Sequence, residues 1–232
     1  MSEPIKVLDH GIVRLVSSMA SDLAISRSAR VSHDAPPREE DEKLINYLME
    51  HRHTTPFESS TFTFEIKAPL FVLRQWHRHR TQSYNELSAR YRELPEEFYV
   101  PEPWLIGRQN PENKQVRDVI TEAEFYRLPQ RERATMIFFS NHIKQANLCS
   151  FQRYKELLRG GVPRELARSV LPVGTYSHMF TTMNLHNLFH FLELRLHAHA
   201  QYEIRVYAEA MFELIKPLVP IAAAAFEKRI SN

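Results

Sequence analysis

The sequence predicts an α+β fold in which helices outweigh strands, and its patterning and composition both support this class. Segments with apolar residues at helical spacing occur along the same chain as segments in which apolar and polar residues alternate. Hydrophobic residues make up 43% of the chain and charged residues 25%, which are globular proportions. A length of 232 residues fits one domain that spans 1–232.

The first half of the chain predicts a strand between two helices. Residues 40–51 predict a helix because their apolar side chains share one face. Residues 60–67 alternate between polar and apolar side chains, which predicts a half-buried strand. Pro69 can occupy the first turn of a following helix, LFVLRQWHRH. Residues 85–92 alternate again, so in an extended chain their polar side chains form a row.

The second half predicts mainly helices. Residues 95–118 are rich in proline and predict a long irregular connection, whereas residues 130–158 predict a helix. Residues 163–171 predict a short helix behind a proline, and residues 175–183 predict a strand. Asn184 is placed to cap a long helix that continues to about residue 215.

The densest group of charged side chains lies in residues 74–92, where five arginines stand against a single acid, Glu86. Arginine forks match phosphate oxygens bidentately, so this excess favours a phosphorylated ligand. A solvated basic face is the alternative. Arg164 and Arg168 share a face of the predicted short helix, and they suit either a further anion contact or a surface ion pair.

Arg195 lies on the apolar face of the helix predicted to begin at Asn184. On a helical wheel it falls inside an arc of six apolar residues: Leu185, Leu188, Phe189, Phe191, Leu192 and Leu196. A buried guanidinium needs a partner because its desolvation alone is costly. That partner is either an internal carboxylate or a bound anion, such as a phosphate or an ionised base.

Other residues give weaker indications of chemistry. His186, His190 and His197 form a stripe with Glu193 on the same predicted helix, and two histidines four residues apart can chelate a metal. No HExxH motif is present, so surface histidines are the favoured interpretation and no metal site is predicted. The single cysteine, Cys149, lacks a basic surrounding that would activate a thiol. Any chemistry is therefore expected to come from a cofactor.

Two other functional classes remain open from the residues alone. One is a metal-dependent phosphohydrolase that uses the histidine stripe and the arginines. The other is an RNA-binding module that uses residues 74–92, although a net charge of +2 argues against nucleic-acid binding. We find no signal peptide and no apolar stretch near 18 residues, so we expect a cytoplasmic protein without a membrane partner.

The segment RHRTQSYNELSARY at 78–91 resembles the signature of the flavin-dependent thymidylate synthases, an RHR followed by S-x-N-E-x-S-x-R-Y. Further segments resemble this family in the expected order: ARVSHD at 29–34, YLMEHRHTTPFE at 47–58, FEIKAPLFVLRQWHRHR at 64–80, GVPRELARSVLP at 161–172 and FHFLELRLHAHAQYEIR at 189–205. The resemblance covers most of the chain, and it is weakest at 95–150.

The resemblance implies a fold, an assembly and a reaction. The fold is a twisted sheet flanked by helices, including a long C-terminal helix, and the assembly is a homotetramer whose active sites are shared between subunits. The reaction converts dUMP to dTMP. Its carbon donor is 5,10-methylenetetrahydrofolate, its hydride comes from FADH2 reduced by NADPH, and it uses no protein nucleophile.

The resemblance also implies site residues. Those that match the family's dUMP contacts are Gln75, Arg78, Glu86, Ser88, Arg90, Arg168 and Arg195. Those that match its FAD contacts are Thr55, Arg78, His79, Arg80, Thr81, Glu86, Asn184, His186 and His190. His53 and Glu58 match residues near the flavin and the folate pocket, and Arg195 matches the catalytic arginine that polarises the uracil. Some relatives carry arginine in place of His186 and asparagine in place of His190.

Overall fold

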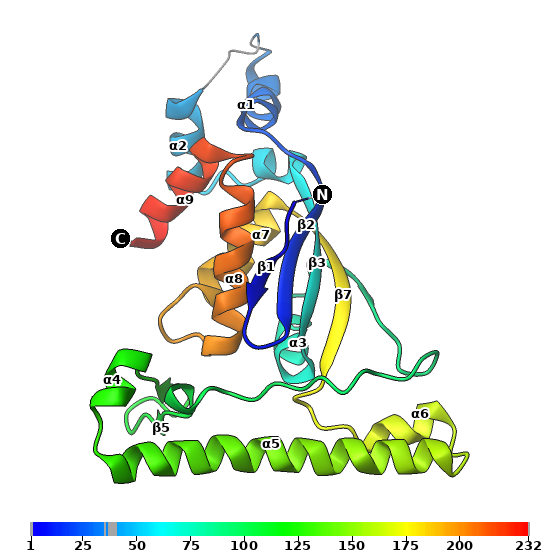
Figure 1. Cartoon of the computed structure of the whole chain (residues 1–232). Helices are drawn as coiled ribbons and strands as arrows, with labels where there is room; N and C mark the ends of the chain where they lie inside the picture. Colours follow the sequence, from blue (N-terminus) through cyan, green and yellow to red (C-terminus); the bar gives the residue numbers. More distant parts are fainter. Residues whose placement is uncertain (1, 35, 37–40, 232) are drawn as a thin grey trace.

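A five-stranded antiparallel sheet forms the centre of the computed structural model, which describes residues 2–34, 36 and 41–231 (Figure 1). The strands lie in the order β1-β2-β3-β7-β4. Their bounds are β1 Ile5–Val7, β2 Gly11–Met19, β3 Thr61–Pro69, β4 Ser83–Glu86 and β7 Tyr176–Asn184. Because β4 pairs only with β7, the strand that carries part of the arginine-rich segment forms an edge of the sheet.

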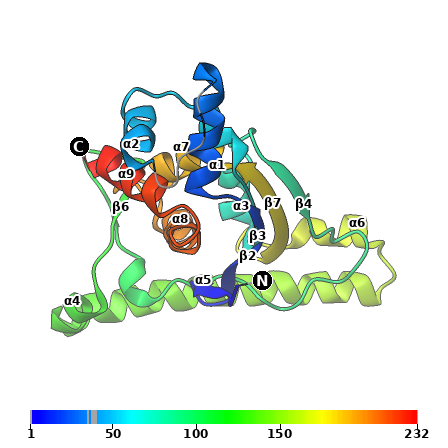
Figure 2. The ribbon, with the colours of Figure 1, turned by 90° about the horizontal axis from the view of Figure 1, so that it is seen from above.

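Most helices cover one face of this sheet. Figure 2 shows α7, α8 and α9 together on one side of it. The helices other than α4, α5 and α6 have the bounds α1 Asp22–Arg30, α2 Glu42–Glu50, α3 Leu70–Trp76, α7 Leu185–Arg195, α8 Tyr202–Ile215 and α9 Pro220–Ser231. Three of the shorter 3₁₀ turns are η1 Val31–His33, η2 Thr55–Ser59 and η3 Pro103–Leu105. None of the helices in the described part of the chain is long and apolar enough to cross a membrane.

Strand β3 and helix α3 form as their sequences predict. Phe62, Phe64 and Ile66 of β3 are fully buried in the core, and the polar residues between them are only partly buried. Pro69 ends the strand in an extended conformation and is the N-cap of α3. The helix ends at Trp76, so it is shorter than the predicted segment. The predicted helix at 40–51 is α2, except that residue 40 lies outside the described residues.

The expected row of polar side chains over 85–92 was wrong beyond Glu86. The last strand-like contact is a hydrogen bond from Leu87 N to His178 O at 2.7 Å. A turn then follows, in which Tyr91 N donates to Ser88 O and Arg90 N donates to the Ser88 hydroxyl. A serine side chain that bonds its own downstream backbone competes with strand pairing, which explains the departure.

The single long helix expected from Asn184 to about residue 215 was also wrong. The cap is confirmed, because the Asn184 side chain accepts a hydrogen bond from Asn187 N at 2.9 Å. The helix then breaks between α7 and α8. His197 accepts a bond from His199 N through its ring nitrogen, and such local side-chain bonds replace helical ones.

The longest helix is α5, Gln130–Arg159, which confirms the helix predicted at 130–158. In Figure 1 it runs across one end of the sheet, with α4 (Glu122–Arg127) and α6 (Arg164–Ala167) near its two ends. Together, α6 and the 3₁₀ turn η4, Arg168–Val170, form the short helix predicted at 163–171. The strand predicted at 175–183 is β7.

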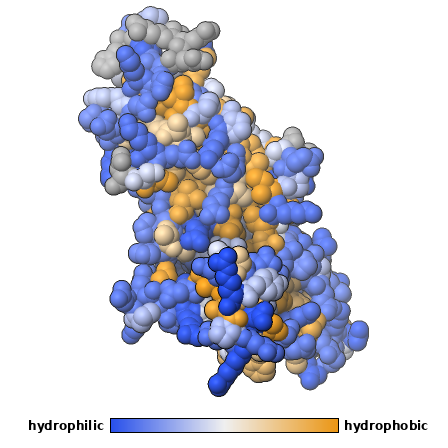
Figure 3. All heavy atoms as spheres, turned by 60° about the vertical axis from the view of Figure 1, so that its left-hand side comes forward, coloured by the Kyte–Doolittle hydropathy of each residue, from blue (hydrophilic) through white to orange (hydrophobic). Residues whose placement is uncertain are grey.

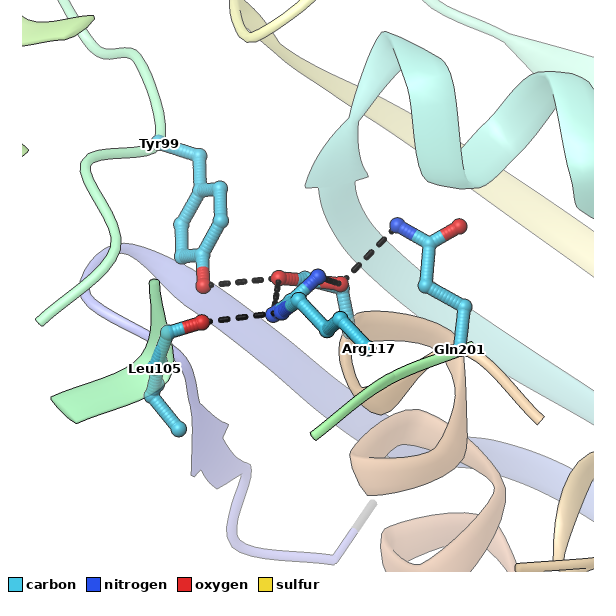
Figure 4. A network of polar contacts seen from close by, with 5 residues as sticks. Tyr99, Leu105, Arg117 and Gln201 are labelled. Atoms are coloured by element: carbon cyan, nitrogen blue, oxygen red, sulfur yellow. Dashed lines mark hydrogen bonds and ion pairs between the residues drawn. The ribbon is translucent and has the colours of Figure 1, made fainter. Parts of the chain in front are cut away.

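The connection at 95–118 is largely irregular, as predicted, but buried polar contacts hold it in place. Figure 4 shows Tyr99 and Arg117 from this connection converging on one carboxylate, that of Glu203 in α8. The Glu203 side chain is buried, and its oxygens lie 2.5 Å and 3.2 Å from the two terminal nitrogens of Arg117. The connection ends in a small hairpin of β5, Arg108–Gln109, and β6, Arg117–Asp118.

Candidate active site

Arg195 and His79 form a direct contact between the end of α7 and the segment that follows α3. Nε of Arg195 donates to Nε2 of His79 at 2.9 Å, and the His79 ring packs edge-on against Phe191. Burial lowers the pKa of His79 to about 4, with further contributions from Arg195 and His190. His79 is therefore neutral at pH 7, and its ring nitrogen can accept the hydrogen bond from the guanidinium.

The charge of Arg195 is not neutralised within the described part of the chain. The guanidinium is half-buried, and its burial lowers its pKa. Its recorded side-chain partner is the neutral imidazole of His79, and no carboxylate among the described residues forms an ion pair with it. Of the two partners that the sequence left open, this arrangement favours a bound anion.

The segment between α3 and β4 is fixed by side chains from its own ends. The Tyr84 hydroxyl donates to His79 O at 2.6 Å, and Trp76 Nε1 donates to Gln82 Oε1 at 3.1 Å. Thr181 of β7 also donates to Gln82 Oε1, at 2.9 Å. These bonds hold the backbone of the RHR motif in one place, which is the first requirement of a preorganised site.

Among the predicted dUMP contacts, Gln75 and Arg78 lie in or beside α3. Gln75 Oε1 is buried and has no hydrogen-bond partner among the described residues, so this acceptor is left unpaired. Arg78 is exposed, as are the predicted flavin residues Arg80 and Thr81. We call Gln75, Arg78, His79 and Arg195 the α3–α7 group.

The remaining predicted dUMP contacts lie near β4 and α6, and Glu165, which the sequence analysis did not single out, links two of them. Arg90 lies 3.6 Å from the Glu165 carboxylate, and Arg168 Nε donates to Glu165 O at 3.3 Å. Glu86 accepts a 2.6 Å hydrogen bond from the Ser177 hydroxyl. We call Glu86, Ser88, Arg90 and Arg168 the β4–α6 group.

The structure therefore brings the predicted dUMP residues together in two groups rather than one. Within the described residues, no hydrogen bond or ion pair joins a member of the α3–α7 group to a member of the β4–α6 group. Each group has an exposed arginine, Arg78 in the first and Arg90 in the second.

Several predicted flavin residues lie around the start of α7. A cavity of about 200 Å³ between α2, η2, α7 and α9 is lined by His186 and His190 together with Thr54, the neighbour of Thr55. The His190 ring is 6.3 Å from that of His79, so the cavity adjoins the Arg195 contact. The Asn184 side chain already caps α7, while Thr55, His53 and Glu58 are exposed.

The comparisons with known proteins identify the family. The family model described as thymidylate synthase complementing protein matches residues 14–221. The chain belongs to this family. It is 46% identical over 234 residues to a flavin-dependent thymidylate synthase of Treponema denticola, covering 100% of this chain and 85% of that protein. A flavin-dependent thymidylate synthase of Thermus thermophilus is 46% identical over 229 residues, covering 97% of this chain and 79% of that protein.

A solved structure supports the same assignment and the α+β fold. The crystal structure of the UMP/dUMP methylase PolB from Streptomyces cacaoi, bound with 5-Br UMP, superposes with a TM-score of 0.81. The two chains are 38% identical, and the match covers 94% of each. The resemblance drawn from the RHR motif is thereby confirmed at the level of the thymidylate synthase complementing protein family.

The structure adds site features that the sequence analysis missed. Arg52 lines the cavity beside His186 and has a φ of 56°, a left-handed conformation that sequence pattern does not reveal for a non-glycine residue. Arg229 of α9 reaches the same cavity and pairs with Glu193 at 2.9 Å. The cavity is thus formed by segments that lie far apart in the chain, so no local motif predicts it.

The histidine stripe does not form a metal site in the described part of the chain. His197 lies beyond the end of α7, so it no longer shares the helical face of His186 and His190. The described residues contain no group of three or more His, Cys, Asp or Glu side chains able to hold a metal ion.

Proposed function

We propose that this chain is a flavin-dependent thymidylate synthase that methylates dUMP to dTMP as a single catalytic domain spanning 1–232. The observation that carries the proposal is the half-buried Arg195, whose charge is left uncompensated by a neutral His79. Membership of the family and the names of the relatives support it. The neighbour PolB, a UMP/dUMP methylase bound with 5-Br UMP, supports a pyrimidine nucleotide as substrate.

We assign dUMP binding to both groups of polar residues. The proposed contacts are Gln75, Arg78, Glu86, Ser88, Arg90, Arg168 and Arg195. Exposed arginine forks suit the phosphate, and the buried free oxygen of Gln75 suits an N–H or O–H donor of the nucleotide. The Glu86 carboxylate accepts only, so it also faces a donor of the nucleotide rather than the phosphate.

We further propose that the protein acts as a homotetramer in which two subunits complete each active site. The absence of a hydrogen bond or ion pair between the two groups in the described part of one chain supports this. The α5 helix also exposes large apolar side chains: Ile137, Phe138, Phe139 and Ile143. In Figure 3, apolar atoms reach the surface at the lower end of the molecule, where α5 runs. A soluble chain gains free energy by covering such a face with a second copy.

The residues around α7 supply part of a site for a flavin. The cavity beside His186 and His190 has an apolar floor that includes Phe57 and Phe189, as a flat ring system requires. We propose FAD contacts at Thr55, Arg78, His79, Arg80, Thr81, Glu86, Asn184, His186 and His190, with His53 and Glu58 near the flavin and folate. Once bound and reduced by NADPH, FAD would supply the hydride, and 5,10-methylenetetrahydrofolate would supply the carbon.

The chain's own contribution is positioning and charge. Methylation requires electron density at a carbon of the uracil ring, and the negative charge that develops on the ring needs a fixed cation. Arg195 supplies this cation, and the hydrogen bond to His79 fixes its direction. Because His79 is neutral, it does not compete with the ring for the guanidinium charge. No protein nucleophile is required, and Cys149 is exposed on α5.

The proposal is tested by mass spectrometry for dTMP. The purified protein is mixed with dUMP, 5,10-methylenetetrahydrofolate, NADPH and FAD, beside an identical mixture without flavin. We expect dTMP only where flavin is present, and we expect the Cys149→Ala variant to form it equally well. Absence of dTMP from folded, flavin-bound protein would contradict the proposal, and loss of turnover in Cys149→Ala would contradict the absence of a protein nucleophile.

We propose that the reaction takes place in the cytoplasm.

A further inference from the structure

His77 occupies an unusual position beside the candidate site. It is the C-cap of α3, and its backbone N donates to Leu73 O at 2.8 Å. Its ring packs edge-on against Tyr84, with 4.8 Å between the ring centroids. The Nε2 atom is buried and has no hydrogen-bond partner among the described residues. A buried polar atom without a partner costs free energy, so its retention calls for an explanation.

The nearest acid to this atom is Glu86, whose Oε2 lies 3.9 Å from His77 Nε2. The other oxygen of the same carboxylate, Oε1, accepts the Ser177 hydroxyl at 2.6 Å. His77 and Ser177 therefore face the two oxygens of the Glu86 carboxylate. The Glu86 backbone is held by the pairing of β4 with β7 opposite Met179. What remains to be fixed is the orientation of the carboxylate itself.

We propose that His77 is a positioning residue that, together with Ser177, orients the Glu86 carboxylate for nucleotide binding. The inference rests on the proposed function, because Glu86 is assigned to the dUMP site there. The separation of 3.9 Å is too long for a hydrogen bond, so His77 acts on Glu86 through the attraction between its ring N–H dipole and the carboxylate charge. Ser177 supplies the direct bond.

The surroundings of His77 leave Glu86 as its charged partner. Tyr84, which packs against the ring, keeps its proton because burial raises its pKa to about 12. Arg74, three residues earlier on α3, is exposed. Among the described residues, Glu86 is the one carboxylate within ion-pair distance of the His77 ring. The attraction is therefore directed at the residue that the nucleotide needs.

Two variants of His77 separate its nitrogen from its ring. His77→Phe keeps an aromatic ring against Tyr84 and removes Nε2, whereas His77→Gln keeps a side-chain N–H donor. We expect His77→Phe to raise the dUMP Kd of the flavin-bound protein, measured by isothermal titration calorimetry, about fivefold with kcat nearly unchanged. We expect His77→Gln to restore most of the affinity. A merely structural ring would give no difference between the two variants.

A matched control exists on the same sheet. His178 of β7 pairs with Glu65 at 2.8 Å, and neither residue belongs to the candidate site. We therefore expect His178→Phe to leave dUMP affinity unchanged. Equal losses in His77→Phe and His178→Phe would show a general effect on the sheet and would overturn the inference.

The decisive measurement is a double-mutant cycle with Glu86→Gln, which removes the charge that His77 attracts. In the Glu86→Gln background, His77→Phe is expected to change the dUMP Kd by less than about twofold. A full fivefold loss in that background, or wild-type affinity in His77→Phe alone, would overturn the inference. If wild-type protein binds dUMP but forms no dTMP, the proposed function fails, while the calorimetric cycle still decides the role of His77.

Discussion

Arg195 and His79 form a pair in which one member is charged and the other is neutral at pH 7. The guanidinium donates through Nε, so its two terminal nitrogens stay available to a ligand. If Arg195 instead formed an ion pair with an internal carboxylate, its charge would be neutralised within the protein and would not be available to a ligand. The arrangement instead places a directed cation at the end of α7, where a developing charge on a bound ring can use it.

Arg195→Ala is expected to abolish most activity while FAD remains bound. Loss of one fixed donor to a developing charge commonly lowers the rate by about 100-fold or more, and we expect a fall of this size in kcat/KM for dUMP. Flavin content is measured by absorbance of the purified variant. Arg14→Ala serves as the control, because Arg14 pairs with Glu65 on the sheet, outside the candidate site. Near-normal turnover of Arg195→Ala would contradict the assigned role.

The lowered pKa of His79 predicts how stability depends on pH. The folded protein binds this proton near pH 4, whereas the unfolded chain binds it near the ordinary value of 6.5. Between these values the unfolded state binds more protons, so stability falls as pH falls from 6.5 to 4 and His79 contributes no further change below that. Partial solvent screening limits the loss to about 2 kcal/mol.

This dependence is measured by urea unfolding between about pH 4 and pH 7, the window in which the unfolded chain binds the extra proton. His79→Gln keeps a carbonyl that can accept from Arg195 but does not titrate. The free energies of unfolding of the wild type and His79→Gln are therefore expected to converge as pH falls through this window, because only the wild type loses the His79 contribution. Parallel curves for the two proteins would contradict the neutral, buried state of His79.

At the scale of elements, the sequence predicted the strands and helices whose sequence patterns lie within a few neighbouring residues. The alternation at 60–67 and the proline before α3 act within a few residues, and both are confirmed. The break in the helix after Arg195 has no glycine or proline to signal it in the sequence. It is held instead by side-chain hydrogen bonds within residues 196–201 and from Arg205. The turn at Ser88 has the same cause, so both were missed.

The connection at 95–118 depends on one buried ion pair. Burial tends to raise the pKa of Glu203, but the hydrogen bonds and charge of Arg117 outweigh this and lower it. Arg117→Met would leave a buried carboxylate without its cation, and we expect a loss of about 3 kcal/mol in the free energy of unfolding. Arg108→Met is the control, because Arg108 pairs with the exposed Glu132.

Urea unfolding of both variants tests this assignment. Equal stability of Arg117→Met and Arg108→Met would mean that the connection is held by its apolar contacts alone. A loss in Arg117→Met without a change in flavin content would instead place the ion pair in the framework, apart from the candidate site. Tyr99 shares the carboxylate at 3.0 Å, so Tyr99→Phe is expected to cost less than Arg117→Met.

At the scale of the whole molecule, the sequence names candidate site residues but not how they are grouped. The RHR motif and the Ser88 segment are neighbours in the chain, yet their side chains belong to different groups. The link from Arg90 through Glu165 to Arg168 joins residues on either side of β5, β6, α4 and α5. Contacts of this kind depend on the packing of β4 against β7 and of α6 beside α5, which no local pattern reveals.

The two groups make a sharp prediction for the assembled protein. If each active site takes its α3–α7 group from one subunit and its β4–α6 group from another, two inactive variants can restore one another. Arg195→Ala and Arg90→Ala damage different groups, so mixed assemblies of the two contain some sites with both groups intact. Random mixing would leave about a quarter of the sites undamaged.

Complementation is measured by co-expressing differently tagged variants, isolating the mixed oligomers and following dTMP formation. We expect Arg195→Ala with Arg90→Ala to recover a substantial fraction of wild-type activity. Arg195→Ala with Gln75→Ala is the matched control, because both changes lie in the α3–α7 group and no combination of subunits escapes both. Failure of the first pair to recover more activity than the control pair would mean that each chain completes its own site.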